Sequence, residues 1–431
     1  MPMMIAYFWS TMKFKCLLFL GSLLIFLGAC RSGAKIHKEP ADIVEQLMKK
    51  NPEEFGDILR KRDSFRVQVI YTQIDRNQKN KPVFTNYYFN VDAGKYYYPA
   101  STVKLPTALL ALEKLNKLQI AGLNPKTSMI TEVGFSNESP VYNDPSSEDG
   151  RPTIEQYVKK IFLVSDNDAF NRLYEFLGQE YINEELHNKG YKGADILHRL
   201  SIFLTEEENR HTNPVRFFDD STREIFSKPL QFNKHAYPQR EDSIGSGYYS
   251  GGKLISQPMN FSRKNKLPLE ELHAIMKSVM FPASVKNKQR FNLTSDQYRF
   301  VWQYLSESPL ESRYPEYDSV NYWDAYGKFL YWGSDKAKLP KTIRSFSKEG
   351  DAYGFLIDAA YLVDFEKNIE FMLSAVIYCN SDGVLNDDKY DYDSVGLPFM
   401  KNLGRLIYDH ELKRPRTRQP DLSTFRLDYK N

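Results

Sequence analysis

The chain has few cysteines, few histidines and almost no net charge. Of its 431 residues only three are cysteine and seven are histidine, and 58 basic residues nearly balance 55 acidic ones. The histidines are scattered without metal-ligand spacing, so we expect no metal and no cofactor. A nearly neutral chain has no field with which to hold nucleic acid, so we expect no nucleic-acid partner either.

Long apolar runs are also missing, apart from one near the start. Residues 16–27 follow Lys13 and Lys15, are too few to span a membrane, and lead into Leu-Gly-Ala-Cys, which ends at Cys30. This pattern is typical of a secretory signal, which we place at residues 1–29. Its ending resembles a bacterial lipobox, in which Cys30 is acylated. We therefore expect a lipid anchor on Cys30 in the bacterial cell envelope, facing the periplasm; a plain N-terminal membrane anchor is the alternative.

Cysteine usage excludes an internal disulfide. Cys16 leaves with the signal and Cys30 carries the lipid, so Cys379 has no partner in the mature chain. About 400 mature residues must then be stabilised by their core alone, which is long enough for a sizeable one. We expect a monomer.

Apolar periodicity predicts strands toward both ends of the mature chain and helices between them. This order predicts an α+β fold, with one antiparallel sheet built from both termini, a helical lobe, and a groove where they meet. The predicted strands are residues 65–74, 83–91, 343–347, 353–363 and 369–379, and the predicted helices are residues 41–59 (broken at Pro52), 101–118, 153–163, 169–177, 294–305 and 397–410.

The predicted organisation has three parts. Residues 30–62 form a tether and an N-terminal helical segment, and residues 63–431 form the main domain with an insertion at about 215–266. The insertion holds a stretch rich in Gly and Tyr at residues 245–252. Such a stretch suits a binding loop, with Tyr248 and Tyr249 at the groove mouth, although a plain surface insertion fits equally well.

Three short motifs follow one another along the domain. Ser-x-x-Lys is weak evidence alone, since it also begins at Ser10, Ser32 and Ser345. The pair Ser101–Lys104 differs because it opens an apolar helix, where an amine at i+3 lies on the same face as the hydroxyl. It is followed by Ser165-Asp166-Asn167 and then by Lys348-Glu349-Gly350, which we place ahead of a strand. Each motif alone also fits a helix cap or a charged turn.

In this order the motifs resemble the Ser-x-x-Lys, Ser-Asp-Asn and Lys-Thr-Gly set of class A β-lactamases and penicillin-binding proteins. The chain is similar to this serine hydrolase superfamily over roughly residues 63–412, and to its class A branch most closely. The resemblance implies that Ser101 attacks a carbonyl, that Lys104 takes its proton, and that Ser165 relays a proton to the leaving nitrogen. The binding groups it implies are Asn167 for the substrate amide, Lys348 for a substrate carboxylate, and the backbone N–H of Asp351, with that of Ser101, for the oxyanion.

The chain departs from the class A pattern in the expected Ω-loop, residues 197–205. The resemblance aligns Ser201 with the family's glutamate, which activates the deacylating water, and Thr205 with the neighbouring asparagine. A hydroxyl cannot act as a carboxylate base near neutral pH. Residues Glu206 to Glu208 lie close by in sequence, but we expect them to form a solvated face. Acylation without efficient deacylation is the predicted result.

A second departure is Glu349, which stands where the family has threonine. Its carboxylate is expected to repel a substrate carboxylate, to pair with Lys348 and cancel its attraction, or to point to solvent.

The sequence therefore predicts a serine acyl-enzyme hydrolase of the cell envelope. Its expected substrates are β-lactams or related peptidoglycan-type amides, such as a D-alanyl stem peptide, or esters. The alternative is a non-catalytic envelope lipoprotein that binds peptidoglycan or a protein partner.

Overall fold

The computed structural model describes residues 42–135 and 139–429. The predicted signal peptide and Cys30 lie outside these residues. Within them, no helix has both the length and the hydropathy needed to cross a bilayer.

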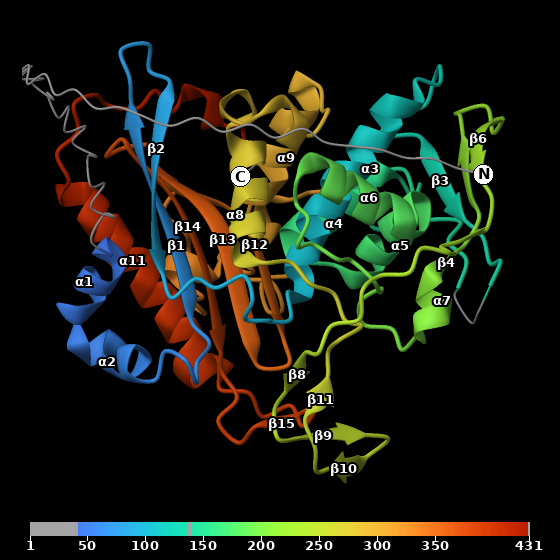
Figure 1. The fold of residues 1–431 in the computed structure, drawn as a ribbon. Coiled ribbons are helices and arrows are strands. Elements are labelled where there is room, and N and C mark those ends of the chain that lie inside the picture. Colours follow the sequence, from blue (N-terminus) through green and yellow to red (C-terminus); the bar gives the residue numbers. More distant parts are fainter. Residues whose placement is uncertain (1–41, 136–138, 430–431) are drawn as a thin grey trace, which may run out of the picture. The chain divides into compact units, whose positions relative to one another are not determined.

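In the described part of the chain, five antiparallel strands form the main sheet, in the order β12-β13-β14-β1-β2 (Figure 1). Strands β1 and β2 come from the N-terminal side and the other three from the C-terminal side, so the pairing of β14 with β1 joins the two ends. The predicted α+β fold is confirmed. The strands are β1 (Gln68–Arg76), β2 (Pro82–Phe89), β12 (Ile343–Ala352), β13 (Phe355–Asp364) and β14 (Ile369–Tyr378).

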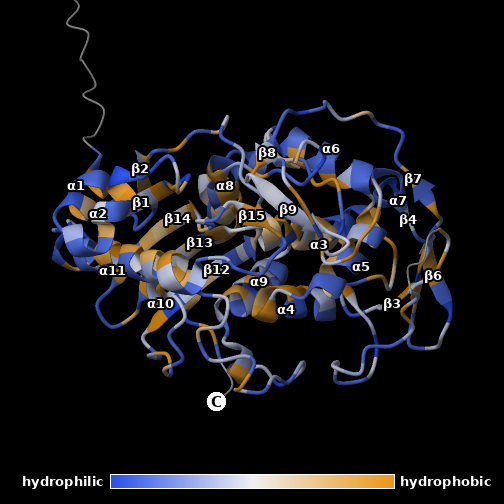
Figure 2. Cartoon of the chain, turned by 90° about the horizontal axis from the view of Figure 1, so that it is seen from below, coloured by the Kyte–Doolittle hydropathy of each residue, from blue (hydrophilic) through white to orange (hydrophobic). Residues whose placement is uncertain are grey.

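Side chains alternate between two cores, one on each face of this sheet. On β1, Val69 and Tyr71 enter one core, while Ile70 and Ile74 enter the other. Figure 2 shows hydrophobic residues on the strands and the flanking helices, with mostly hydrophilic outer loops. The first core contains α1 (Ile43–Lys49), α2 (Pro52–Arg60), α10 (Phe329–Trp332) and α11 (Leu397–Lys413), and the second contains α8 (Leu269–Met280).

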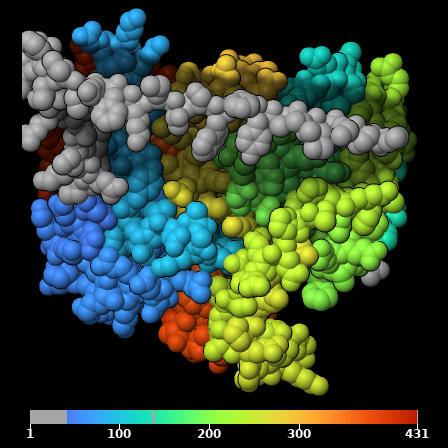
Figure 3. Space-filling model, viewed as in Figure 1, coloured from blue at the N-terminus to red at the C-terminus, as the bar shows by residue number. Residues whose placement is uncertain are grey.

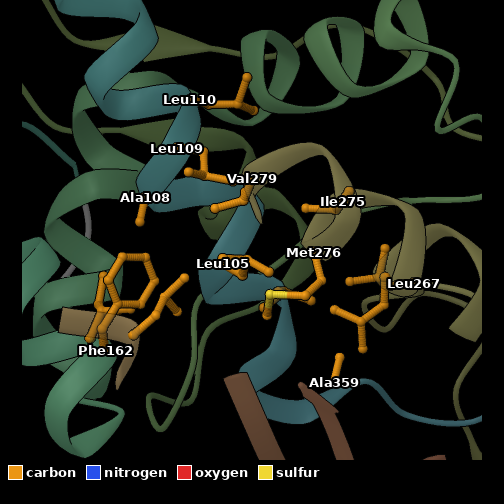
Figure 4. Packing of buried hydrophobic residues seen from close by; sticks show 14 of the residues in the cluster. Leu105, Ala108, Leu109, Leu110, Phe162, Leu267, Ile275, Met276, Val279 and Ala359 are labelled. Carbon is orange, nitrogen blue, oxygen red and sulfur yellow. The ribbon is translucent and has the colours of Figure 1, made fainter. Parts of the chain in front are cut away.

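The helical lobe is built around α3 (Lys104–Leu118). This helix is buried on nearly every side. Leu105 and Leu109 lie beside Met276 and Val279 of α8, with Phe162 close by (Figure 4). Each fully buried leucine contributes about 1.5–3 kcal/mol, so the helix that begins at the first motif is firmly held. The surrounding helices are α4 (Ile154–Val164), α5 (Asn167–Leu177), α6 (Gln179–Lys189) and α9 (Ser295–Ser306).

The predicted insertion forms small sheets beside the lobe. Strand β9 of the insertion pairs in parallel with β15, which follows β14, so the insertion is attached to the C-terminal part of the chain. In Figure 3 this contact appears as yellow-green atoms beside an orange-red patch at the bottom. The short elements are β3 (Ser128–Thr131), α7 (Glu206–Arg210), β4 (His211–Thr212), β5 (Val215–Phe218), β6 (Glu224–Lys228), β7 (Gln231–Phe232), β8 (Ser243–Ile244), β9 (Gly247–Ser250), β10 (Lys253–Ile255), β11 (Met259–Asn260) and β15 (Val384–Leu385).

Two motif placements differ from the expectation. The third motif was expected ahead of a strand, but Lys348-Glu349-Gly350 lies inside β12, which continues to Ala352. The strand ends later because the turn is made by Tyr353 and Gly354, whose φ angles of 53° and 80° suit a two-residue hairpin. The first motif begins in a 3₁₀ turn, Ala100–Val103, and not in the α-helix itself.

Candidate active site

Ser101 and Lys104 meet through the 3₁₀ turn that precedes α3. In a 3₁₀ turn the side chains at i and i+3 eclipse each other. Lys104 Nζ accordingly lies 2.8 Å from Ser101 Oγ. Ala100, just before the serine, has a φ of 47°, a left-handed conformation that is rare for alanine and that clusters at functional sites. The fold thus fixes this hydroxyl beside this amine.

The second motif forms the turn between α4 and α5. Asp166 caps α5 by accepting the N–H of Ala169 at 2.8 Å, so its carboxylate has a structural task. Ser165 and Asn167, on either side of Asp166, both contact Lys104. Lys104 Nζ lies 2.5 Å from the carbonyl oxygen of Ser165, 3.3 Å from Ser165 Oγ and 2.7 Å from Asn167 Oδ1.

Lys104 is a buried amine in the middle of these groups. Burial, with the nearby charge of Lys348, lowers its pKa well below the usual lysine value. The Ser165 carbonyl and Asn167 Oδ1 only accept hydrogen bonds, so they take two N–H donors of the amine. A neutral amine then keeps its lone pair for the Ser101 hydroxyl, which is the arrangement a general base needs.

The third motif reaches the same site from the edge of the sheet. Lys348 Nζ lies 2.9 Å from Ser165 Oγ, which places this hydroxyl between two lysines. A Cβ at Gly350 would lie 2.7 Å from the backbone N of Ser101 and 3.0 Å from that of Thr102. Only glycine allows β12 to pack so closely on Ser101. The structure therefore brings the three motifs together.

The strand register also predicts which backbone N–H of β12 points toward Ser101. The two-residue turn makes Ala352 and Phe355 a hydrogen-bonded pair, and alternation then makes Asp351 and Leu356 a non-hydrogen-bonded one. Since β12 lies at the edge of the described sheet, we expect the N–H of Asp351 to point outward, to the side where the Ser101 backbone touches Gly350. The predicted oxyanion donors are compatible with this geometry.

Glu349 pairs with Lys348, which is one of the three expected arrangements. Lys348 Nζ lies 2.9 Å from Glu349 Oε1 and 3.1 Å from the Glu349 carbonyl oxygen. The glutamate packs on Gly327, where a Cβ would lie 3.1 Å from its carboxylate carbon. Residues 306–342 carry no predicted element, so the role of Gly327 is missed from the sequence. The unusual length of that unassigned stretch was the available signal.

The expected Ω-loop is held by a buried ion pair and brings Ser201 to the site. Arg199 Nη2 lies 2.5 Å from Glu175 Oε1, and both side chains are buried. Ser201 Oγ accepts a hydrogen bond from Asn167 Nδ2 at 2.8 Å, so a hydroxyl sits beside the second motif. Glu208 instead completes the capping box of α7 with Thr205, its Oε2 lying 2.7 Å from the Thr205 nitrogen.

A cavity of about 260 Å³ lies behind this loop and is separate from the serine. His198, Phe203 and Lys264 are among its lining residues, and Ser101 and Lys104 are not. Burial lowers the pKa of His198 to about 3, so its ring stays neutral. In the described part of the chain, no three His, Cys, Asp or Glu side chains group as metal ligands.

One family model matches part of the chain, the part that holds the first two motifs. The model of the β-lactamase enzyme family matches residues 53–224. Solved structures similar to this chain include the class A β-lactamase from Clostridium kluyveri DSM 555 (14% identity, TM-score 0.45, 85% of this chain and 98% of that one) and the β-lactamase from Xanthomonas campestris pv. campestris (11%, 0.46, 84% and 98%). A search of the curated proteins finds no match. The family match confirms the predicted resemblance to β-lactamases over residues 53–224.

Proposed function

We propose that this β-lactamase-like hydrolase works through an acyl-enzyme on Ser101 and releases its acyl group slowly. Its proposed substrates are β-lactams, D-alanyl stem peptides or related amides, or esters. The observation that carries the proposal is the 2.8 Å contact between Ser101 Oγ and the buried Lys104 amine, whose pKa is lowered.

Acylation would proceed in two steps. Lys104 Nζ takes the Ser101 proton while Oγ bonds to the carbonyl carbon, and the displaced electron pair becomes an oxyanion held by the N–H groups of Ser101 and Asp351. When the carbonyl re-forms, the leaving nitrogen or oxygen takes a proton from Ser165 Oγ. Ser165 regains one from the Lys104 ammonium, 3.3 Å away, so the Ser101 proton ends on the leaving group.

Deacylation requires a base that activates water. The hydroxyl of Ser201 sits where the resemblance places a carboxylate, and it cannot take a proton from water at neutral pH. The ester on Ser101 would therefore persist.

The test is the intact mass of the mature protein over time after addition of a β-lactam. We expect a lasting adduct that Ser101→Ala abolishes. Ser345→Ala is the matched control, because Ser345 also precedes a lysine by three residues. On a strand, however, residues i and i+3 face opposite sides, so Ser345 and Lys348 form no pair. A folded wild-type protein that gains no mass would contradict the proposal.

The second candidate is a non-catalytic envelope protein that binds peptidoglycan. Two features favour it: Glu349 pairs with the Lys348 cation, and a hydroxyl, that of Ser201, lies beside Asn167 where the resemblance implies a carboxylate base. Co-sedimentation with purified peptidoglycan, by a protein that gains no adduct from β-lactams or active esters, would support this function.

We further propose that the protein is a monomer held at the envelope by lipid on Cys30. Cys30→Ser is expected to move it from the membrane fraction to the soluble fraction. Mass analysis of the N-terminal peptide measures the lipid directly.

A further inference from the structure

The groups that surround Lys348 face the leaving group of the substrate. Lys348 donates to Ser165 Oγ, the hydroxyl placed to deliver the leaving group's proton. A charged side chain beside Lys348 therefore affects whether the leaving group can carry a charge of its own. This step rests on the proposed function.

The ammonium group of Lys348 is already paired with groups of the protein itself. Its three N–H donors are directed at Ser165 Oγ, the Glu349 carbonyl and Glu349 Oε1, at 2.9, 3.1 and 2.9 Å. Its side chain is 0% exposed and that of Glu349 is 8% exposed. A substrate carboxylate could bind Lys348 only by displacing Glu349 and leaving a buried charge without its partner, which is strongly unfavourable.

The Glu349 carboxylate lies against Gly327, where a Cβ would come within 3.1–3.3 Å of the carboxylate carbon and both oxygens. Gly327 has a φ of 71°, so a larger residue there would also be strained. The segment before β12 is thus shaped around this carboxylate.

The rest of this side of the site is acidic as well. Asp351 lies two residues beyond Glu349, on the same face of β12, and is exposed. Asp166, Glu349 and Asp351 all act electrostatically on Lys104. A second negative charge brought by a substrate would meet these carboxylates at short range.

We propose that Glu349 makes this site select acyl donors whose leaving group carries no carboxylate. The preferred substrates are esters or amides with a neutral or cationic leaving group, and free C-terminal carboxylates are disfavoured. Glu349 acts by neutralising Lys348 and by its own charge.

A matched pair of β-lactams tests the selection: one with its free ring carboxylate and its methyl ester. Acylation rates at Ser101 are measured by intact mass. We expect wild-type protein to react at least tenfold faster with the ester. Glu349→Thr should lower this ratio at least tenfold, and Glu349→Gln, which keeps the shape, should lower it in part. Glu206→Gln is the control, an exposed acid of α7 that should leave the ratio unchanged. Equal rates, or a faster free acid, would overturn the inference.

Equilibrium binding separates this inference from the acyl-enzyme mechanism. Ser101→Ala protein is titrated with an acyl-D-alanyl-D-alanine and with its C-terminal amide. We expect the amide to bind at least tenfold more tightly; equal binding, tighter binding of the acid, or no binding of either overturns the inference. Amide preference without any β-lactam adduct on wild-type protein would overturn the mechanism alone.

Discussion

At the scale of single residues, the proposed acylation depends on a lysine whose surroundings favour its neutral form. Lys104 is buried beside the charge of Lys348, and both effects lower its pKa well below the usual value. Acylation needs the neutral amine, so its rate should rise with pH as Lys104 loses its proton and then level off. The plateau should begin well below the pH at which an ordinary lysine loses its proton, and a pH profile of adduct formation measures this.

Lys104→Arg tests this assignment. A guanidinium stays protonated, so we expect acylation to fall by roughly 10²- to 10⁴-fold, the usual contribution of a general base. Lys114→Arg is the control: burial lowers the pKa of Lys114 to about 7, but its amine bonds to the carbonyls of Phe176 and Leu177. An unchanged rate in Lys104→Arg would contradict the role.

Local spacing explains why these residues could be predicted from the sequence. Ser101 and Lys104 share one turn, and Ser165 and Asn167 flank one helix cap, so a few adjacent residues determine how they point. The partner of Glu349 could not be predicted in this way. Its arrangement depends on Gly327, which a separate segment brings against it.

At the scale of elements, the proposed slow deacylation depends on the Ω-like segment, residues 197–205. Ser201 Oγ lies 2.8 Å from Asn167 Nδ2, so a longer acid at this position would reach toward the site. We expect Ser201→Glu to speed the loss of the adduct at least tenfold, because its carboxylate can accept a proton from water. Ser201→Gln has the same length without the basic carboxylate and should show no gain. If both variants release the adduct alike, the alignment of Ser201 with the glutamate is wrong.

Strand β13 carries a buried acid behind the site. Burial, with the charge of Glu349, raises the pKa of Asp358 to about 7, while the N–H of Leu330 opposes the shift. Between about pH 4 and 7, Asp358 thus keeps a proton in the folded protein that it has lost in the unfolded chain. The contribution of Asp358 to the free energy of unfolding therefore falls as pH rises through that window.

Asp358→Asn should remove that pH dependence. We expect the variant to match the wild type near pH 4 and to be more stable by roughly 1–3 kcal/mol at pH 7.5. Urea unfolding at both pH values measures the difference. A wild-type stability that rises steadily from pH 4 to 7, unaltered by the substitution, would rule out a raised pKa.

Most elements followed from periodicity, and the exceptions have physical causes. The helix break at Pro52 is real because proline suits the first position of α2. The third motif lies inside β12 because the turn is made by Tyr353 and Gly354, whereas the charged residues of the motif suggest an earlier turn. Residues 306–342 had no predicted element, and their path depends on packing against β12.

At the scale of the whole molecule, both ends of the chain complete one sheet. Strands predicted at both ends implied this, but not which would be neighbours. The register of β1 with β14, Gln68 opposite Val376, depends on pairing between distant residues that no local pattern encodes. The candidate site depends on this pairing, because β12 belongs to the C-terminal part of the chain and Ser101 to the N-terminal part.

A buried charge network ties these two ends together. Glu411 of α11 is 0% exposed and accepts hydrogen bonds from Tyr71 of β1, from Arg414 at 3.0 Å and from Arg416. Glu411→Gln would remove the carboxylate that pairs with Arg416 and leave Arg414 with Asp75 alone, which should cost about 2–4 kcal/mol. Because one sheet joins the whole domain, the loss should be global.

Denaturation followed by near-ultraviolet circular dichroism and by adduct formation should give the same lowered midpoint. Asp57→Asn, in an exposed pair with Arg60, should cost under about 0.5 kcal/mol. Separate midpoints for the two probes would mean that the ends unfold independently.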